Sequence, residues 1–312
     1  MVAFDLEKYL RLRRALIDKA LERHFRGQPG HSHSLWKAMR YALFPGGKRI
    51  RPILTLAAGE LFGGKAKSLL PFACAAEMIH AYSLIHDDLP ALDDDDLRRG
   101  EPTTHKVFGE GIALLAGDGL LTEAFHAMSA PWVKCALPAG LVLQLIDEFS
   151  HAAGVAGLVG GQAFDLEAEE SEVDIAAVEY IHVRKTGALI LASIRAGAQI
   201  GGAKPADLRR VSRYGELLGL AYQIADDILD AHGAAAKNER GESGRKERKK
   251  ATYPSVVGLA QARERLGELY RQCLKELAHY GPAAEALRAM TRYILGRALQ
   301  ERSNSIAQEI EV

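Results

Sequence analysis

Apolar side chains recur at helical spacing along almost the whole 312-residue chain. The first segment shows the pattern, with Leu6, Tyr9, Leu10 and Leu16 on one face. Spacings of three and four residues are typical of an amphipathic α-helix, whereas a half-buried strand requires strict alternation, which is missing here. The helical pattern recurs in the segments 66–86, 104–129, 137–151, 205–230, 251–279 and 283–302. The sequence therefore predicts an all-α protein.

Glycine and proline pairs such as Gly63-Gly64, Gly201-Gly202 and Gly281-Pro282 separate these segments and indicate short turns. The segments 137–166 and 186–203 are apolar on most faces, which is typical of buried helices. No linker-like composition interrupts the chain before a polar, charge-dense loop expected from residue 234 to residue 250. We expect residues 1–312 to form a single domain, a large bundle of about ten or more helices around a central cavity.

Composition excludes several classes of protein. Lys+Arg and Asp+Glu both total 40, so no nucleic-acid partner is indicated. The N-terminus is charged throughout and the longest apolar stretches are short, so we expect no signal peptide and no membrane insertion. Cys74, Cys135 and Cys273 are far apart and odd in number, which predicts neither a disulfide framework nor a zinc site. A reducing cytoplasm fits this cysteine usage.

The first acidic cluster follows a segment, Ala73–Ile85, that is almost entirely apolar or small. Acidic groups are disfavoured at a helix C-terminus by the helix dipole. Neighbouring carboxylates also repel one another by about 1–4 kcal/mol per pair, and a bound cation would remove that cost. Asp87 and Asp93 are six residues apart, and Pro90 between them predicts a distortion that brings them together. The alternative is a solvated acidic turn.

The second acidic cluster has helical spacing. Asp226 and Asp230 lie four residues apart, and Asp227 adjoins the first of them. Such a pair shares one helical face and suits Mg²⁺, which takes one or two carboxylates and completes its octahedron with water and phosphate oxygens. Facing each other across a cavity, the two clusters would hold Mg²⁺ around a diphosphate. A calcium-binding loop at Asp93–Asp96 of the first cluster is a poor alternative, because the EF-hand spacing and its distal glutamate are absent.

Basic residues supply candidate phosphate contacts. Gly47, Lys48 and Arg51 open a predicted helix, where glycine permits close backbone approach and the helix N-terminus favours anions. A basic helix start on the surface is the alternative. Four further residues are candidate phosphate ligands, each with a structural alternative. Arg98 and Arg99 could instead balance the acid run. His80 could belong to the core, and Lys185 could extend to solvent.

Six motifs in this order resemble the trans-isoprenyl diphosphate synthases, most closely the bacterial farnesyl diphosphate synthases. They are GGKRIRP, EMIHAYSLIHDDLPALDDDDLRRGEPTTH, GLVGGQAFDL, HVRKTGALI, YQIADDILD and KATYPSVVG. The resemblance covers almost the whole chain and implies one polyprenyl synthase domain, usually a homodimer, with a helical bundle around a deep cavity.

The resemblance implies a role for each matched residue. About three Mg²⁺ ions would be held by two motifs, and these comprise Asp87, Asp88, Asp93, Asp226, Asp227 and Asp230. Isopentenyl diphosphate would be bound through Lys48, Arg51, His80 and Arg99. The allylic diphosphate would be bound through Arg98, Lys185, Thr186, Gln223 and Lys250. Arg98, Lys185, Thr186 and Gln223 would also stabilise charge during the reaction.

The expected reaction is condensation of isopentenyl diphosphate with dimethylallyl or geranyl diphosphate. In the family, an aromatic residue five positions before the first aspartate points to a C15 product, and Tyr82 is at that position. Tyr82 and Ser83 are therefore candidates for the cavity floor, and farnesyl diphosphate is the expected product. Alternatives are a C20 geranylgeranyl diphosphate synthase, a terpene cyclase or a non-catalytic partner subunit. The last is motivated by Arg245, which stands where the family has an aspartate, whereas Arg240 could replace the family lysine as a phosphate cation.

Overall fold

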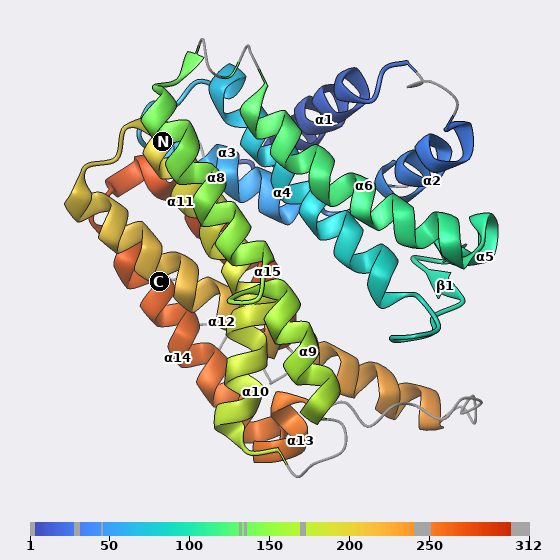
Figure 1. Cartoon of the computed structure of the whole chain (residues 1–312). Coiled ribbons are helices and arrows are strands. Elements are labelled where there is room, and N and C mark those ends of the chain that lie inside the picture. Colours follow the sequence, from blue (N-terminus) through green and yellow to red (C-terminus); the bar gives the residue numbers. More distant parts are fainter. Residues whose placement is uncertain are drawn as a thin grey trace. The chain divides into compact units, whose positions relative to one another are not determined.

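The computed structural model describes residues 4–27, 32–44, 46–130, 133, 136–168, 173–239 and 251–300 (Figure 1). Within these residues the chain is almost entirely helical, which confirms the all-α prediction. The longer helices are α1 (Leu6–His24), α2 (His33–Leu43), α3 (Ile50–Leu61), α4 (Ala66–Asp87), α6 (Glu110–Ser129), α8 (Ala139–Ala153), α9 (Leu158–Ala168), α11 (Ala188–Gly201), α12 (Pro205–Glu239), α14 (Leu259–Ala278) and α15 (Glu285–Gln300). The short ones are α5 (Thr104–Phe108), α10 (Ile175–Ile181), a π-helix (His182–Gly187), α13 (Tyr253–Val257) and a 3₁₀ turn (Gly281–Ala284). A two-residue hairpin pairs β1 (Leu97–Arg98) with β2 (Glu101–Pro102).

Most predicted segments match observed helices, with three differences. The segment 137–166 is not one helix, because the chain leaves helical geometry after Ala153 and resumes it at Leu158. Gly154 and Gly157 stand in that break, and glycine is a poor helix former. The segments 104–129 and 251–279 are each divided as well, at Gly109 and at Gly258, both with φ of +82°.

The loop predicted to begin at residue 234 is also wrong at its start, because α12 continues to Glu239. Three consecutive alanines, residues 234–236, extend that helix, and alanine has the highest helix propensity. Arg240, Arg245 and Lys250 lie outside the described residues.

Contacts between Cα atoms divide the chain into two compact units. The N-terminal unit comprises Glu7–Asp147 and Ala196–Gly202. The C-terminal unit comprises the described residues of Met1–Leu6, Glu148–Arg195 and Ala203–Val312. The first acidic motif therefore belongs to the N-terminal unit and the second to the C-terminal unit.

Helix α4 forms the core of the N-terminal unit, where it packs against α3 and α6 (Figure 1). Its apolar side chains Phe72, Met78 and Ile79 are fully buried. Among the described residues only α4 is long and apolar enough to cross a membrane, but 78% of its apolar window is buried inside the protein. This burial is expected of a core helix. The core position also fixes where α4 ends, which is at the first acidic motif.

Helix α12 is the central element of the C-terminal unit and packs against α14, α15 and the π-helix. The contact with the π-helix is close, because a Cβ atom added at Gly219 would lie 2.6 Å from Cα of Gly187. The fully buried Tyr214 ties α12 to α15, with its hydroxyl 3.0 Å from that of Thr291. These contacts place the second acidic motif beside the π-helix.

Candidate active site

The first acidic motif is built by the end of α4 and a turn. Helix α4 ends at Asp87, and the backbone N–H of Asp93 donates to the carbonyl of Asp87 over 2.8 Å. The N–H of Asp94 donates to the carbonyl of Leu89, and Asp94 adopts a left-handed conformation with φ of +51°. The predicted distortion near Pro90 is therefore a helix end followed by a turn, and it brings the backbones of Asp87 and Asp93 together.

The middle aspartate of this motif is bound by the protein. Asp88 is 3% exposed, and Arg98 donates to its carboxylate from Nε over 2.7 Å. Arg98 also reaches Asp95, at 3.3 Å. Burial raises the pKa of Asp88 above the ordinary value of an aspartate, while the hydrogen bond from Arg98 opposes that rise. Arg98 thus balances buried acid in this structure, and its predicted contact with a diphosphate remains a prediction.

A cluster of cations forms in the same unit. Arg99 donates to the carbonyl of Gly46, and a Cβ atom on Gly47 would lie 2.7 Å from the Arg99 guanidinium. Burial, and then the charges of Arg51 and Arg99, hold the pKa of His80 well below its ordinary value. The structure therefore places Arg99 at the glycine turn and brings the charges of Arg51 and Arg99 near His80. Lys48 is exposed next to that turn.

Sequence reasoning missed the role of Arg49. This residue is 3% exposed, has φ of +51°, and precedes the first turn of α3. Its guanidinium lies 2.7 Å from Glu77 and 3.0 Å from Asp18, and it donates to the carbonyl of Leu43. Glu77 was the available signal, because a lone acid within the apolar segment Ala73–Ile85 needs a buried cation. Arg49 thus anchors the stretch that presents Lys48 and Arg51.

Tyr82 and Ser83, the predicted floor residues, are both buried on α4. The Tyr82 hydroxyl has no hydrogen-bond partner in the part of the chain that the structure describes. Burial, with a smaller contribution from Asp87, raises the pKa of Tyr82 to about 12. The Tyr82 ring lies edge-on to His86, with centroids 5.7 Å apart. Ser83 differs, since its hydroxyl donates to the carbonyl of His80. Tyr82 is therefore the bulkier of the two candidates and the one whose hydroxyl lacks a hydrogen-bond partner among the described residues.

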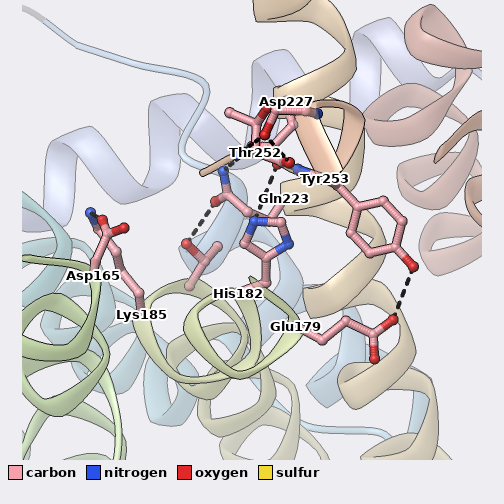
Figure 2. A network of polar contacts seen from close by, with 10 residues as sticks. Asp165, Glu179, His182, Lys185, Gln223, Asp227, Thr252 and Tyr253 are labelled. Carbon is pink, nitrogen blue, oxygen red and sulfur yellow. Dashed lines mark hydrogen bonds and ion pairs between the residues drawn. The ribbon is translucent and has the colours of Figure 1, made fainter. Parts of the chain in front are cut away.

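The second acidic motif lies entirely within α12. Asp226 and Asp230 are exposed, whereas Asp227 is 6% exposed. The Asp227 carboxylate accepts from the backbone N–H of Tyr253 over 2.7 Å and from Nε2 of Gln223 over 3.1 Å, and it lies 3.2 Å from Nε2 of His182. Figure 2 shows these groups converging on Asp227. The predicted shared face of Asp226 and Asp230 is thus exposed, while their neighbour is held by the protein.

The π-helix carries Lys185 and Thr186, the predicted contacts of the allylic diphosphate. The Thr186 hydroxyl donates to Oε1 of Gln223 over 2.9 Å, so the structure brings this predicted pair together. Lys185 is paired with Asp165 of α9 at 2.7 Å. Sequence reasoning gave Asp165 no role, although it lies within GLVGGQAFDL. Single-turn π-helices inserted between α-helices are frequently found at functional sites.

Glycine permits close packing of α9 on the π-helix. A Cβ atom at Gly161 would lie 2.4 Å from the backbone nitrogen of Lys185, a distance that neither backbone could accept without moving. Gly161, the last glycine of GLVGGQAFDL, therefore allows the close approach that sets the position of Lys185.

The donor set of each motif fits magnesium. Within the described residues, no group of three or more His, Cys, Asp or Glu side chains forms a ready-made metal cage. Mg²⁺ does not need one, because it keeps several waters and is commonly bound through one or two carboxylates together with substrate phosphates. Each motif has an outer pair of aspartates that are half-buried or exposed, and a buried middle aspartate, Asp88 or Asp227, that the protein holds. This arrangement suits a metal that arrives together with a diphosphate.

Comparisons with known proteins agree with this geometry. A family model described as polyprenyl synthetase matches residues 32–290. The chain is 46% identical over 266 residues to a farnesyl diphosphate synthase of Geobacillus stearothermophilus, covering 85% of this chain and 89% of the relative. It is 41% identical over 298 residues to a geranylgeranyl diphosphate synthase of Cyanophora paradoxa, covering 94% and 97%. An FPP/GFPP synthase from Zymomonas mobilis, known as a crystal structure, superposes with a TM-score of 0.83 at 38% identity, over 93% of this chain and 98% of that one.

Proposed function

The chain belongs to the polyprenyl synthetase family and is a prenyltransferase, and we propose that it condenses isopentenyl diphosphate with dimethylallyl and geranyl diphosphates to give farnesyl diphosphate. The observation that carries this proposal is that both units contain candidate phosphate-binding residues and an acidic motif. Each unit holds its own acidic motif and its own diphosphate-binding candidates, Arg51, His80 and Arg99 in one and Lys185 and Thr186 in the other. A reaction between two diphosphates needs two groups of phosphate-binding residues, and the two acidic motifs would together serve the allylic diphosphate.

The four outer aspartates would hold magnesium, about three ions in all as the family resemblance suggests, and these are Asp87, Asp93, Asp226 and Asp230. Asp88 and Asp227 complete the two motifs from buried positions. Bound magnesium supplies electrostatic stabilisation to the diphosphate that leaves the allylic substrate. The chemistry of the donor set supports this assignment.

The remaining side chains would bind and orient the two substrates. Lys185 and Arg98 neutralise the allylic diphosphate, and the Thr186 hydroxyl and Gln223 carbonyl stabilise the allylic cation as dipoles. The contact between Thr186 and Gln223 supports the second of these roles.

Isopentenyl diphosphate would be clamped beside Gly47, and its double bond attacks the cation to form the new carbon–carbon bond. Its binding residues in this proposal are Lys48, Arg51, His80 and Arg99. A proton then passes from the condensed intermediate to the departing diphosphate. Lys250 stays a predicted contact of the allylic diphosphate outside the described residues.

A direct assay tests the proposal. The purified protein is incubated with labelled isopentenyl diphosphate, dimethylallyl diphosphate and Mg²⁺, with EDTA as the control, and the products are separated by carbon number. A magnesium-dependent C15 product is expected. A C20 product would favour the geranylgeranyl alternative, a cyclic hydrocarbon would favour a cyclase, and no product would favour the non-catalytic subunit.

Tyr82 provides the test of product length. Each further isoprene unit would gain about 4 kcal/mol of burial, at about 0.8 kcal/mol per carbon, and a buried tyrosine in its path opposes that gain. We expect Tyr82→Ala to lengthen the product beyond C15 and Tyr82→Phe, which keeps the ring, to leave it at C15. If the alanine variant still makes only C15, Tyr82 is not the floor.

A homodimer, a cytoplasmic location and a single domain around a central cavity belong to the same proposal. Exposed aliphatic side chains of the N-terminal unit support the dimer, and these are Val107, Leu114, Leu115 and Leu143. The buried free thiols of Cys74 and Cys273 suit a reducing compartment. One family model spans residues of both units, which supports a single domain. Light scattering on Leu114→Asp/Leu115→Asp protein, expected to be monomeric, tests the dimer.

A further inference from the structure

His182 is a buried histidine that takes no part in the proposed reaction. It begins the π-helix, is 4% exposed, and has its Nε2 atom 3.2 Å from Oδ2 of Asp227. Its other ring nitrogen, Nδ1, is buried and has no hydrogen-bond partner among the described residues. Burying an unpartnered polar atom costs free energy that an apolar side chain would avoid. The contact with Asp227 must therefore offset that cost.

Asp227 joins three segments that are far apart in the sequence. It belongs to α12, accepts the backbone N–H of Tyr253 at the start of α13, and contacts His182 of the π-helix (Figure 2). The rings of His182 and Tyr253 are stacked, with centroids 6.3 Å apart and an angle of 26° between them. The Tyr253 hydroxyl closes the network by donating to Glu179 of α10 over 3.0 Å.

Helix α13 depends on these contacts. It has five residues, and a helix this short does not hold together in water without tertiary contacts. The N–H of Tyr253 is one of the first helical amides, which lack partners within the helix. Asp227 supplies that partner through Oδ2, and Nε2 of the His182 ring contacts the same carboxylate oxygen.

We propose that His182 is a positioning residue that fastens the π-helix to Asp227 and to the first turn of α13. This inference rests on the proposed function, because it gives His182 the task of keeping Lys185 and Thr186 aligned with the second acidic motif. Both residues lie within four positions of His182 on the same π-helix. Movement of the π-helix would displace them together and would leave the isopentenyl diphosphate contacts of the N-terminal unit unchanged.

The kinetic test compares His182→Ala with two matched variants. His182→Gln retains a side-chain N–H that can donate to Asp227, and Tyr214→Phe removes a buried tyrosine hydroxyl bond elsewhere in the same unit. For His182→Ala we expect kcat to fall and the KM of the allylic substrate to rise, each about tenfold, the effect of losing one hydrogen bond to a charged group. The KM of isopentenyl diphosphate should stay within about twofold of the native value. His182→Gln should recover most of the loss.

A second measurement separates this inference from the proposed function. Hydrogen exchange of the Tyr253 amide should become about tenfold faster in His182→Ala and remain near native in Tyr214→Phe, whether or not the protein proves to make farnesyl diphosphate. Faster exchange in the alanine variant alone supports the positioning role. Native exchange in that variant, or equal changes in both substrates' KM values, would overturn it. Absence of product from native protein would count against the proposed function only.

Discussion

The two acidic motifs share their residue types but differ in backbone. The first leaves its helix at Asp87 and returns through a turn in which Asp93 bonds to the Asp87 carbonyl, whereas the second remains helical throughout. In both, the middle aspartate is buried and the protein holds its carboxylate. The partner of Asp88 is the side chain of Arg98, which is 32% exposed, while Asp227 receives a backbone amide. In each motif one buried carboxylate therefore secures local structure, while the outer aspartates are half-buried in the first motif and exposed in the second.

The largest effect is expected from neutralising one outer aspartate in either motif. Asp87→Asn and Asp226→Asn should each lower kcat by about 10²–10³-fold, the cost of removing one preorganised electrostatic contact at a reacting centre. Their free energies of unfolding should change by less than about 1 kcal/mol, because neither side chain is buried. Steady-state kinetics and urea denaturation measure the two quantities.

Asp94→Asn is the matched control, since it removes the same charge from an exposed aspartate of the same turn. Asparagine tolerates the left-handed conformation of that position, so the backbone should be preserved. Native turnover in both Asp87→Asn and Asp226→Asn would refute the metal assignment and the proposed function with it.

Glycine contacts provide the next test of the comparison. A Cβ atom at Gly161, beside the second motif's region, would meet the backbone nitrogen of Lys185 at 2.4 Å. For a Cβ atom at Gly117, on α6 beside the first motif's helix, the three nearest atoms belong to the side chain of His86, the first of them at 2.1 Å. Gly161→Ala should therefore displace the π-helix and lower kcat by about 10–100-fold, because misplacing a catalytic group by about 1 Å has that cost.

Gly117→Ala should have the smaller kinetic effect, because the His86 ring can rotate away. That rotation would break the contact of His86 Nε2 with the Leu114 carbonyl and lower the free energy of unfolding by about 1 kcal/mol. Equal losses of kcat in the two alanine variants would show that the π-helix is not fixed by its contact with α9.

Much of the second motif could be predicted from the sequence, and less of the first. Helical spacing alone places Asp226 and Asp230 on one face, and α12 carries them there. The turn after Asp87 was foreseen only as an unspecified distortion at Pro90, because a helix end and a kink produce similar patterns. The sequence leaves the partner of Arg98 undecided, because a cation that follows an acidic run can balance carboxylates or bind phosphates equally well.

Long-range contacts explain the remaining omissions. A π-helix adds one residue to a turn, and the apolar pattern of 182–187 is too short to display it. Arg49 and Glu77 meet only in the folded chain, from 28 positions apart. His182 and Tyr253 are brought together by Asp227 and stand in separate motifs of the sequence. The resemblance supplied the residues around the substrates, but the contacts that hold those residues come from the fold.

The buried middle aspartates should differ in their contribution to stability. Asp227→Asn weakens contacts with a backbone amide and a histidine that have no access to water, so the free energy of unfolding should fall by about 1–3 kcal/mol. Asp88→Asn should cost less, because burial already disfavours the charged carboxylate, as its raised pKa indicates, and Arg98 can turn toward solvent. Urea denaturation at pH 7 measures both. A larger loss in Asp88→Asn would reverse the ranking of the two sites.

The smallest effect is expected at His80, which lies near arginine charges in the N-terminal unit, whereas His182 of the C-terminal unit lies beside a carboxylate. Burial and the charges of Arg51 and Arg99 lower the pKa of His80, so below pH of about 6.5 the unfolded chain binds a proton that the folded chain does not. This histidine therefore lowers stability progressively as pH falls, by at most about 1.4 kcal/mol per pH unit.

His80→Gln should remove that loss, so the unfolding free energy of the native protein should decline relative to the variant between pH 8 and 5. His279→Gln, at an exposed position, is the matched control for the loss of an imidazole. Parallel pH profiles for native protein and His80→Gln would mean that the cations do not act on His80, and the isopentenyl diphosphate cluster would lose its electrostatic support.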